Sequence, residues 1–179
     1  MIPVLIWNAY GLGARLKSDI IASEVSSHKT ALAGILEHKQ DSARICAISK
    51  KIRMHGFLHA APTNRHIWIF WHKSFRVEQV LAGDSCITVK ASCDTHSFFV
   101  SFVYGSCDPL QRGALCDNLN TFDPGNLPWI VRGDFNLVPD PTERKGRGPF
   151  TRRASLEFAQ FMAGKGLIDL GYSRDRFTC

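Results

Sequence analysis

Four short apolar runs of this sequence each end on a polar side chain. The runs cover residues 4–7, 31–36, 96–103 and 128–133, and the polar residues are Asn8, Glu37, Tyr104 and Asp134, with Asn136 two positions further on. Short apolar runs bounded by turn residues are typical of buried strands. Strands buried on both faces occur in layered α/β proteins. The sequence therefore predicts an α/β fold in which several strand ends carry polar groups.

The segments between these runs alternate between helical and strand patterns. Apolar residues recur at helical spacing over 16–25, 45–52, 110–119 and 156–162, which predicts four helices, the first with Leu16, Ile20, Ile21 and Val25 on its apolar face. Residues 66–71, 77–83 and 86–92 are rich in β-branched and aromatic side chains and are predicted as further strands. Because no repeat or linker divides the chain, we expect one mixed α/β domain over residues 1–179.

Composition restricts the class of protein. The 45% hydrophobic and 21% charged residues are ordinary for a globular chain, and 22 basic against 16 acidic residues give a formal charge of +6. That surplus favours a polyanionic partner such as nucleic acid, although solubility alone also accounts for it. No apolar stretch approaches the roughly 20 residues of a membrane helix. The first residues lack a secretory pattern, so we expect an intracellular protein with its six cysteines reduced.

The polar strand ends share a chemical logic. In layered α/β folds, sites gather where strands end, because a strand holds a reacting group rigidly. Mg²⁺ prefers oxygen ligands and often one or two carboxylates, so Glu37 is a candidate ligand. Asp134 is a candidate to orient or deprotonate a water, and Asn8, Asn136 and Tyr104 are candidates to donate to phosphate oxygens. Each residue also has an ordinary interpretation as part of a turn, a solvated surface or a packed strand end.

Six segments follow one another along the chain in an order known from one family. They are WNAYGLG (7–13), ILEHK (35–39), HIWIFW (66–71), FVYG (102–105), PWIVRGDFN (128–136) and GLIDLGYSRDRFT (166–178). In this order they resemble the endonuclease/exonuclease/phosphatase family, and most closely the endonuclease domain of plant LINE-type retrotransposon polyproteins. The resemblance implies a four-layer α/β sandwich of two mixed β-sheets flanked by helices, C-terminally truncated. It also implies phosphodiester hydrolysis with Mg²⁺, or with Mn²⁺ as the alternative ion.

The resemblance also implies a role for each polar strand end. Asn8 and Glu37 match the residues that form the metal site. Tyr104 matches the tyrosine that contacts the scissile phosphate. Asp134 and Asn136 match the pair that positions the water and stabilises the transition state.

The chain departs from the family pattern near its end. Asp169 matches the aspartate that supports a catalytic histidine in many members, but the sequence contains no Asp-His dipeptide, and its seven histidines all precede GDFN. With that acid–base group missing, we expect weak or no cleavage by this chain. The alternative is a catalytically inactive remnant that binds nucleic acid or a protein partner. Members of the family that cleave phosphoinositides or sphingomyelin fit the basic surplus less well.

Four arginines are candidates for contact with nucleic acid. The basic segment ERKGRGPFTRR (143–153) follows GDFN and contains Arg147, Arg152 and Arg153, and Arg112 comes eight residues after Tyr104. Arginine binds phosphate in a bidentate manner, so we expect nucleic acid, and DNA first, as the partner, with no membrane association. A solvated loop explains the segment 143–153 equally well.

The run HIWIFW offers a further choice. Its tryptophans, Trp68 and Trp71, are predicted as core residues and not as base-stacking residues. His66 and His72, which flank the run, are predicted at the surface and not as metal ligands. The family resemblance favours the nucleus as the location and leaves the oligomeric state open.

Overall fold

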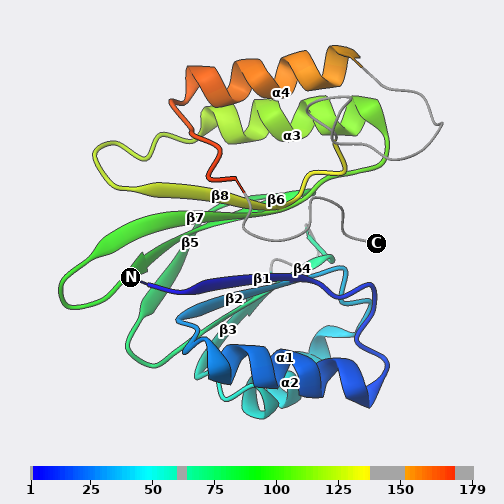
Figure 1. Cartoon of the computed structure of the whole chain (residues 1–179), viewed down its shortest axis with the longest axis vertical. Coiled ribbons are helices and arrows are strands. Elements are labelled where there is room, and N and C mark those ends of the chain that lie inside the picture. The colour runs from blue at the N-terminus through cyan, green and yellow to red at the C-terminus, as the bar shows by residue number, and fades with distance from the viewer. Residues whose placement is uncertain (1, 60–63, 138–151, 172–179) are drawn as a thin grey trace. The chain divides into compact units, whose positions relative to one another are not determined.

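Eight strands form two four-stranded sheets in the computed structural model of the chain, which describes residues 2–59, 64–137 and 152–171 (Figure 1). One sheet, called here the β1–β4 sheet, has the order β1 (Val4–Asn8), β2 (Leu32–Leu36), β4 (Ile67–Trp71), β3 (Gly56–His59). The other, the β5–β8 sheet, has the order β5 (Arg76–Gly83), β6 (Cys86–Ser92), β7 (Ser97–Tyr104), β8 (Trp129–Asp134). The pairs β1–β2 and β7–β8 are parallel and the other pairs antiparallel, so both sheets are mixed, as predicted.

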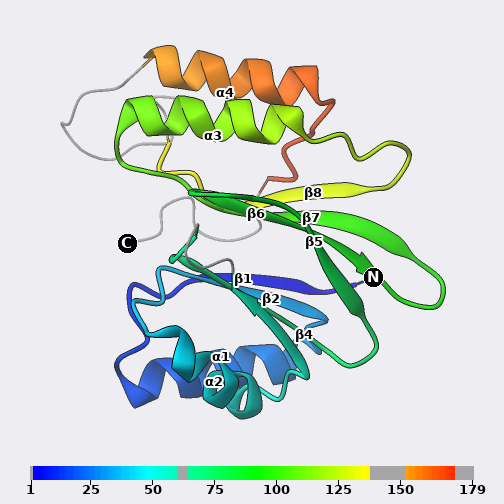
Figure 2. The ribbon, with the colours of Figure 1, turned by 180° about the vertical axis from the view of Figure 1, so that it is seen from behind.

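Internal contacts divide the chain into two units. The first unit, Met1–Tyr104 with Pro124–Asp134, contains both sheets together with α1 (Arg15–Ser27), the short helix η1 (Ser42–Arg44) and α2 (Ile45–Lys51). The second unit, Gly105–Asp123 with Phe135–Cys179, contains α3 (Pro109–Thr121) and α4 (Arg152–Gly164), which lie side by side (Figure 2). The Lys165 ammonium links them by donating to the carbonyls of Asn120 at 2.7 Å and Phe122 at 2.8 Å.

An apolar layer joins the two sheets of the first unit. Leu36 and Ile69 from one sheet and Val89 and Phe102 from the other belong to the same buried cluster. All five residues of β2 and four of the five in β4 are buried. These two strands are therefore covered on both faces, which explains why their sequences are continuous apolar runs.

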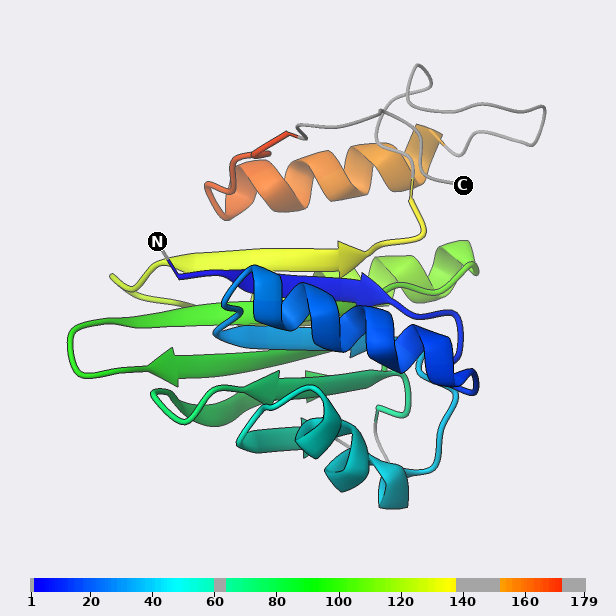
Figure 3. The ribbon, with the colours of Figure 1, turned by 60° about the horizontal axis from the view of Figure 1, so that its bottom comes forward.

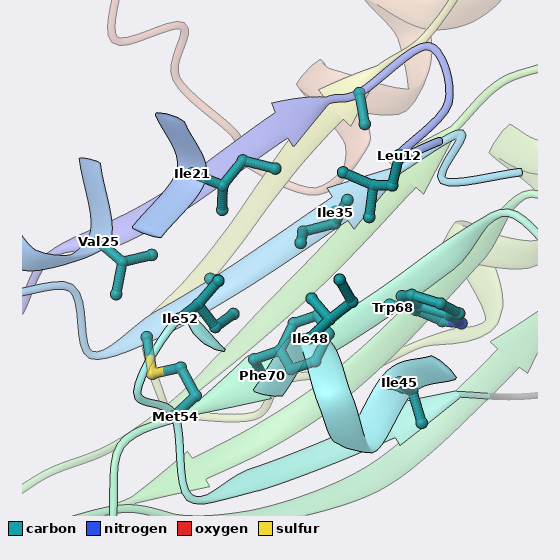
Figure 4. Packing of buried hydrophobic residues seen from close by; sticks show 12 residues of the cluster. Leu12, Ile21, Val25, Ile35, Ile45, Ile48, Ile52, Met54, Trp68 and Phe70 are labelled. Carbon is teal, nitrogen blue, oxygen red and sulfur yellow. The ribbon is translucent and has the colours of Figure 1, made fainter. Parts of the chain in front are cut away.

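The opposite face of the β1–β4 sheet is covered by α1 and α2 (Figure 4). Ile21 of α1 and Ile48 of α2 pack with Ile35 of β2 and with Trp68 and Phe70 of β4. Trp68 is only 2% exposed and Trp71 is partly buried, which confirms the prediction that these tryptophans are packed residues.

The predicted apolar face of α1 is partly wrong. Ile21 and Val25 are buried together with Ser18, but Leu16 is 68% exposed and Ile20 is 38% exposed. The spacing explains the difference, because at 3.6 residues per turn Leu16 and Ile20 lie about 150° around the helix from the stripe of Ser18, Ile21 and Val25. Only this stripe faces the sheet.

The remaining predicted elements are observed, and β3 is an addition that the sequence analysis did not contain. None of the helices within residues 2–59, 64–137 and 152–171 could span a membrane. The five cysteines in these ranges are free thiols.

Candidate active site

The polar strand ends of the first unit belong to the two parallel pairs of strands. In β1 and β2, Asn8 is the register partner of Leu36, so Asn8 and Glu37 lie next to each other at the end of the β1–β4 sheet. In β7 and β8, Tyr104 is the register partner of Asp134. Each sheet thus presents one carboxylate and one other polar group at the carboxyl ends of two parallel neighbours.

A hydrogen bond joins the two sheets at these ends. The Asn8 amide donates from Nδ2 to Asp134 Oδ2 at 2.8 Å, across 126 positions of sequence. The other side of the amide is also engaged, because Asn8 Oδ1 accepts the Tyr10 N–H at 3.2 Å. Strands β1 and β8 lie side by side and run in the same direction (Figure 3). The Asn8 amide is therefore fixed in the orientation that directs its N–H to the carboxylate.

Glu37 lies in a strained turn directly after β2. Its φ is +50°, a left-handed value that few residues with a side chain adopt. Backbone bonds hold this conformation: the Glu37 N–H donates to the His66 carbonyl and the Gly11 N–H donates to the Glu37 carbonyl, each at 2.8 Å. The Glu37 side chain is only 13% exposed, and its Oε1 lies 2.9 Å from Lys39 Nζ. This hydrogen bond to Glu37 raises the pKa of Lys39.

His66 makes a second connection between the two sheets, because it contacts both Glu37 and Tyr104. Its carbonyl is bonded to Glu37, and its ring lies 5.1 Å from the ring of Tyr104, between centroids. Tyr104 packs partly into the apolar layer between the sheets. The polar strand ends and His66 thus form a closed series of neighbours. This series, called here the rim cluster, consists of Asn8, Asp134, Tyr104, His66 and Glu37. His66 is exposed, as predicted, but its place beside Tyr104 was not predicted.

The residue after Glu37 is a buried histidine. His38 is 3% exposed, its ring stacks on Trp68 at 3.8 Å between centroids, and its Nδ1 accepts the Gln40 N–H at 3.1 Å. Burial, and after it the electrostatic influence of His66, lower the pKa of His38 from 6.5 to about 4. His38 is consequently a neutral packing residue beneath the rim cluster at ordinary pH.

The other predicted site residues in the described ranges belong to the second unit. Asn136 has a φ of +47° and donates from Nδ2 to the Gly105 carbonyl at 2.6 Å. The half-buried Arg112 donates from Nη1 to the carbonyls of Ser106 at 3.2 Å and Cys107 at 2.7 Å. Asp169 is exposed, and its Oδ1 accepts a backbone N–H in a turn after α4. The roles implied for these three residues stay predictions.

The basic segment 143–153 is described only at its end. Arg147 lies outside the described residues, whereas Arg152 and Arg153 lie in the first turn of α4. Their predicted contact with nucleic acid also stays a prediction.

The rim cluster has donors that suit a divalent cation. Within the described parts of the chain, no three His, Cys, Asp or Glu side chains gather as a metal cage. The cluster instead offers two carboxylates, a side-chain amide and a phenol, which are oxygen-rich groups of the kind that Mg²⁺ uses together with water or phosphate. The ammonium of Lys39 beside Glu37 shows that this position already stabilises a positive charge.

Comparison with known proteins gives matches of structure only. No protein-family model and no curated protein sequence matches the chain. The endonuclease domain of TRAS1, a telomere-specific non-LTR retrotransposon, matches with a TM-score of 0.70 at 16% identity, over 96% of this chain and 76% of that one. The chain has the endonuclease/exonuclease/phosphatase fold. The predicted sandwich of two mixed sheets is thereby confirmed.

Two further structures share this endonuclease/exonuclease/phosphatase fold. TDP2 of D. rerio, in complex with a single-strand DNA product, matches with a TM-score of 0.59 at 15% identity, over 95% of this chain and 66% of that one. The AP endonuclease LMAP from Leishmania major matches with a TM-score of 0.67 at 14% identity, over 92% of this chain and 66% of that one. The chain thus spans about three quarters of the TRAS1 domain and just under two thirds of the other two proteins.

Proposed function

We propose that the rim cluster is a metal-dependent site for phosphodiester hydrolysis in nucleic acid, with low turnover in this chain. The observation that carries the proposal is the hydrogen bond from Asn8 to Asp134, which ties the Asp134 carboxylate to the strand end next to Glu37. Ordinary turn chemistry involves residues that are close in sequence, so it does not explain why residues this distant in sequence meet at two strand ends. A positioned carboxylate pair with amide and phenol donors is the set that hydrolysis of a phosphodiester requires.

Each residue then has a defined task. Glu37 and Asn8 would hold Mg²⁺, which when bound supplies positive charge to the phosphate. Asp134, held by the Asn8 amide, orients and deprotonates the attacking water, as a fixed general base must. Tyr104 donates its hydroxyl to a phosphate oxygen and so stabilises the charge that builds up in the transition state.

Nucleic acid is the substrate class that the chain's charge favours. The formal charge of +6 attracts a polyanion, and the matching structures are named as endonucleases or, for D. rerio TDP2, as a complex with single-strand DNA. DNA is accordingly the first candidate.

The second candidate is a nucleic-acid-binding module without catalysis. The Lys39 ammonium, 2.9 Å from Glu37, favours it, because a carboxylate that already has a cationic partner binds Mg²⁺ less readily.

Plasmid nicking tests the first candidate against the second. The full chain is incubated with supercoiled DNA and Mg²⁺, next to Glu37→Gln and to Glu24→Gln, which neutralises an acid on α1 that pairs with His28. We expect slow nicking by the wild type and by Glu24→Gln, no nicking with a chelator, and a loss of at least about 100-fold in Glu37→Gln.

The outcomes separate the two candidates. DNA that is retained in a gel-shift assay but never nicked would replace the first candidate by the second. Nicking that persists in Glu37→Gln would show that the rim cluster is not the site.

A further inference from the structure

Tyr10 is an exposed aromatic residue directly beside the rim cluster. Its side chain is 72% exposed, whereas Phe57, the next exposed aromatic in the described residues, is 38% exposed. A single exposed aromatic residue needs no explanation by itself. Tyr10 differs because specific contacts hold it in this position, and these contacts need an explanation.

The backbone of Tyr10 is fixed on both sides. Its N–H donates to Asn8 Oδ1 at 3.2 Å, and Lys17 Nζ donates to the carbonyls of Ala9 at 2.9 Å and Tyr10 at 3.0 Å. Its φ is +44°, a left-handed value that is unfavourable for a bulky residue. A conformation of this kind persists only where the surrounding structure enforces it. The Tyr10 ring is therefore carried on a rigid turn that is anchored to the site residue Asn8.

The Tyr10 ring is also linked to Glu37 through a cation. Lys39 Nζ lies 4.0 Å from the centre of the ring and 2.9 Å from Glu37 Oε1. An ammonium over the ring is attracted by its π-electrons. The same ammonium is close enough to the site to neutralise a phosphate of a bound strand, and the Lys17 ammonium, bonded to the Tyr10 carbonyl, adds a second cation to this turn. The surroundings of Tyr10 thus combine an open aromatic surface with positive charge.

We propose that Tyr10 is a stacking platform for an unpaired nucleobase of the bound nucleic acid. Aromatic rings set among cations bind single strands in this way, because the ring stacks on the base and the cations attract the backbone. A base inside a duplex has both faces covered by its neighbours, so the platform selects a strand with at least one unstacked base. This inference rests on the proposed function and adds the substrate class to it.

Binding measurements on matched oligomers test the platform. Fluorescence anisotropy in EDTA compares an oligothymidylate of about 12 nucleotides with an abasic backbone of the same length and charge. The variants are Tyr10→Phe, which keeps the ring, and Tyr10→Asn, which removes it and suits left-handed backbone. Phe57→Ala is the control for an exposed aromatic elsewhere.

We expect Tyr10→Asn to weaken binding of the oligothymidylate by at least about fivefold and to leave binding of the abasic backbone within about twofold of the wild type. Tyr10→Phe and Phe57→Ala should bind both oligomers like the wild type. Equal loss on the two oligomers, or no loss on either, would overturn the stacking role alone. A wild-type chain that binds neither oligomer would overturn the proposed function and this inference with it.

Discussion

The β1–β4 sheet and the β5–β8 sheet each deliver one carboxylate to the rim cluster, from the end of a parallel pair of strands. They differ in what holds that carboxylate. Glu37 lies one residue beyond β2, in a left-handed turn that is tied to two other loops by backbone hydrogen bonds. Asp134 is the last residue of β8 and is still paired in the sheet with Tyr104.

This difference shows two ways of fixing a reactive group. On the Glu37 side, loops determine the position, and the side chain has an ammonium as its partner. On the Asp134 side, strand packing determines the position, and the partner is the Asn8 amide. Loop-built positions depend on hydrogen bonds and charge, whereas strand-built positions depend on close backbone contact. The two sides should therefore respond to different perturbations.

The largest effect is expected from a methyl group added on the Asp134 side. A Cβ at Gly133 would overlap the backbone of Val103, whereas a Cβ at Gly34 in the other sheet would overlap the ring of Phe102. A ring in a packed core moves more readily than a paired backbone. We expect Gly133→Ala to lower the free energy of unfolding by about 3 kcal/mol or more, and Gly34→Ala by about 1 to 3 kcal/mol, as measured by urea denaturation.

The control for this pair is Gly13→Ala, because no atom lies within 4 Å of a Cβ at Gly13. Its free energy of unfolding should stay within about 1 kcal/mol of the wild type. If Gly133→Ala were as stable as Gly13→Ala, close backbone packing of β8 against β7 would not be what fixes the position of Asp134.

Acid is expected to lower the free energy of unfolding through His38, the buried residue next to Glu37. His38 is buried and neutral there, and its pKa falls from 6.5 to about 4 on folding, mainly because burial disfavours the charged ring. The unfolded chain binds the proton more readily, so stability is complete above pH 6.5 and is lost as the pH falls towards 4. The shift corresponds to about 3 kcal/mol in the free energy of unfolding.

Urea denaturation at several pH values measures this slope, and His38→Phe is the matched variant because it keeps a ring to stack on Trp68. We expect a clearly flatter dependence of stability on pH in His38→Phe. The same slope in both proteins would assign the acid sensitivity to other groups.

The strand-built side was more accessible to sequence analysis than the loop-built side. The apolar runs that end at Tyr104 and Asp134 predict both strands and their polar ends, because a strand fixes where its last side chain lies. The sequence also predicts Asn8 and Glu37 from the same pattern. Packing of Trp68 follows from its place in a continuous apolar run.

The contacts that sequence analysis missed all depend on strand order or on turn conformation. His66 meets Tyr104 because β4 runs antiparallel to β2, which no local pattern specifies. Lys39 reaches Glu37 because both residues have a φ of +50°, a conformation that their types do not indicate. The four-residue strand β3 is too short for its periodicity to stand out.

The smallest effect is expected from the charge partner of Glu37. A cation that binds at the rim cluster must displace the Lys39 ammonium from Glu37, whereas Asp134 accepts a hydrogen bond from the neutral Asn8 amide. Lys39→Met keeps the aliphatic stem and removes the competing charge. Because Lys39 is 53% exposed, water weakens the ion pair, and the expected gain is modest. We expect Mg²⁺ to bind up to about fivefold more tightly in Lys39→Met, as measured by calorimetric titration.

Lys51→Met is the matched control for this titration. Its ammonium lies 2.7 Å from Asp19 Oδ1 on α1, so it removes an ion pair of similar geometry that has no part in the rim cluster. Its Mg²⁺ affinity should equal that of the wild type. If Lys39→Met instead bound Mg²⁺ more weakly than Lys51→Met, Lys39 would assist the cation, and the Glu37 side would be held by a network of charges and not by a replaceable partner.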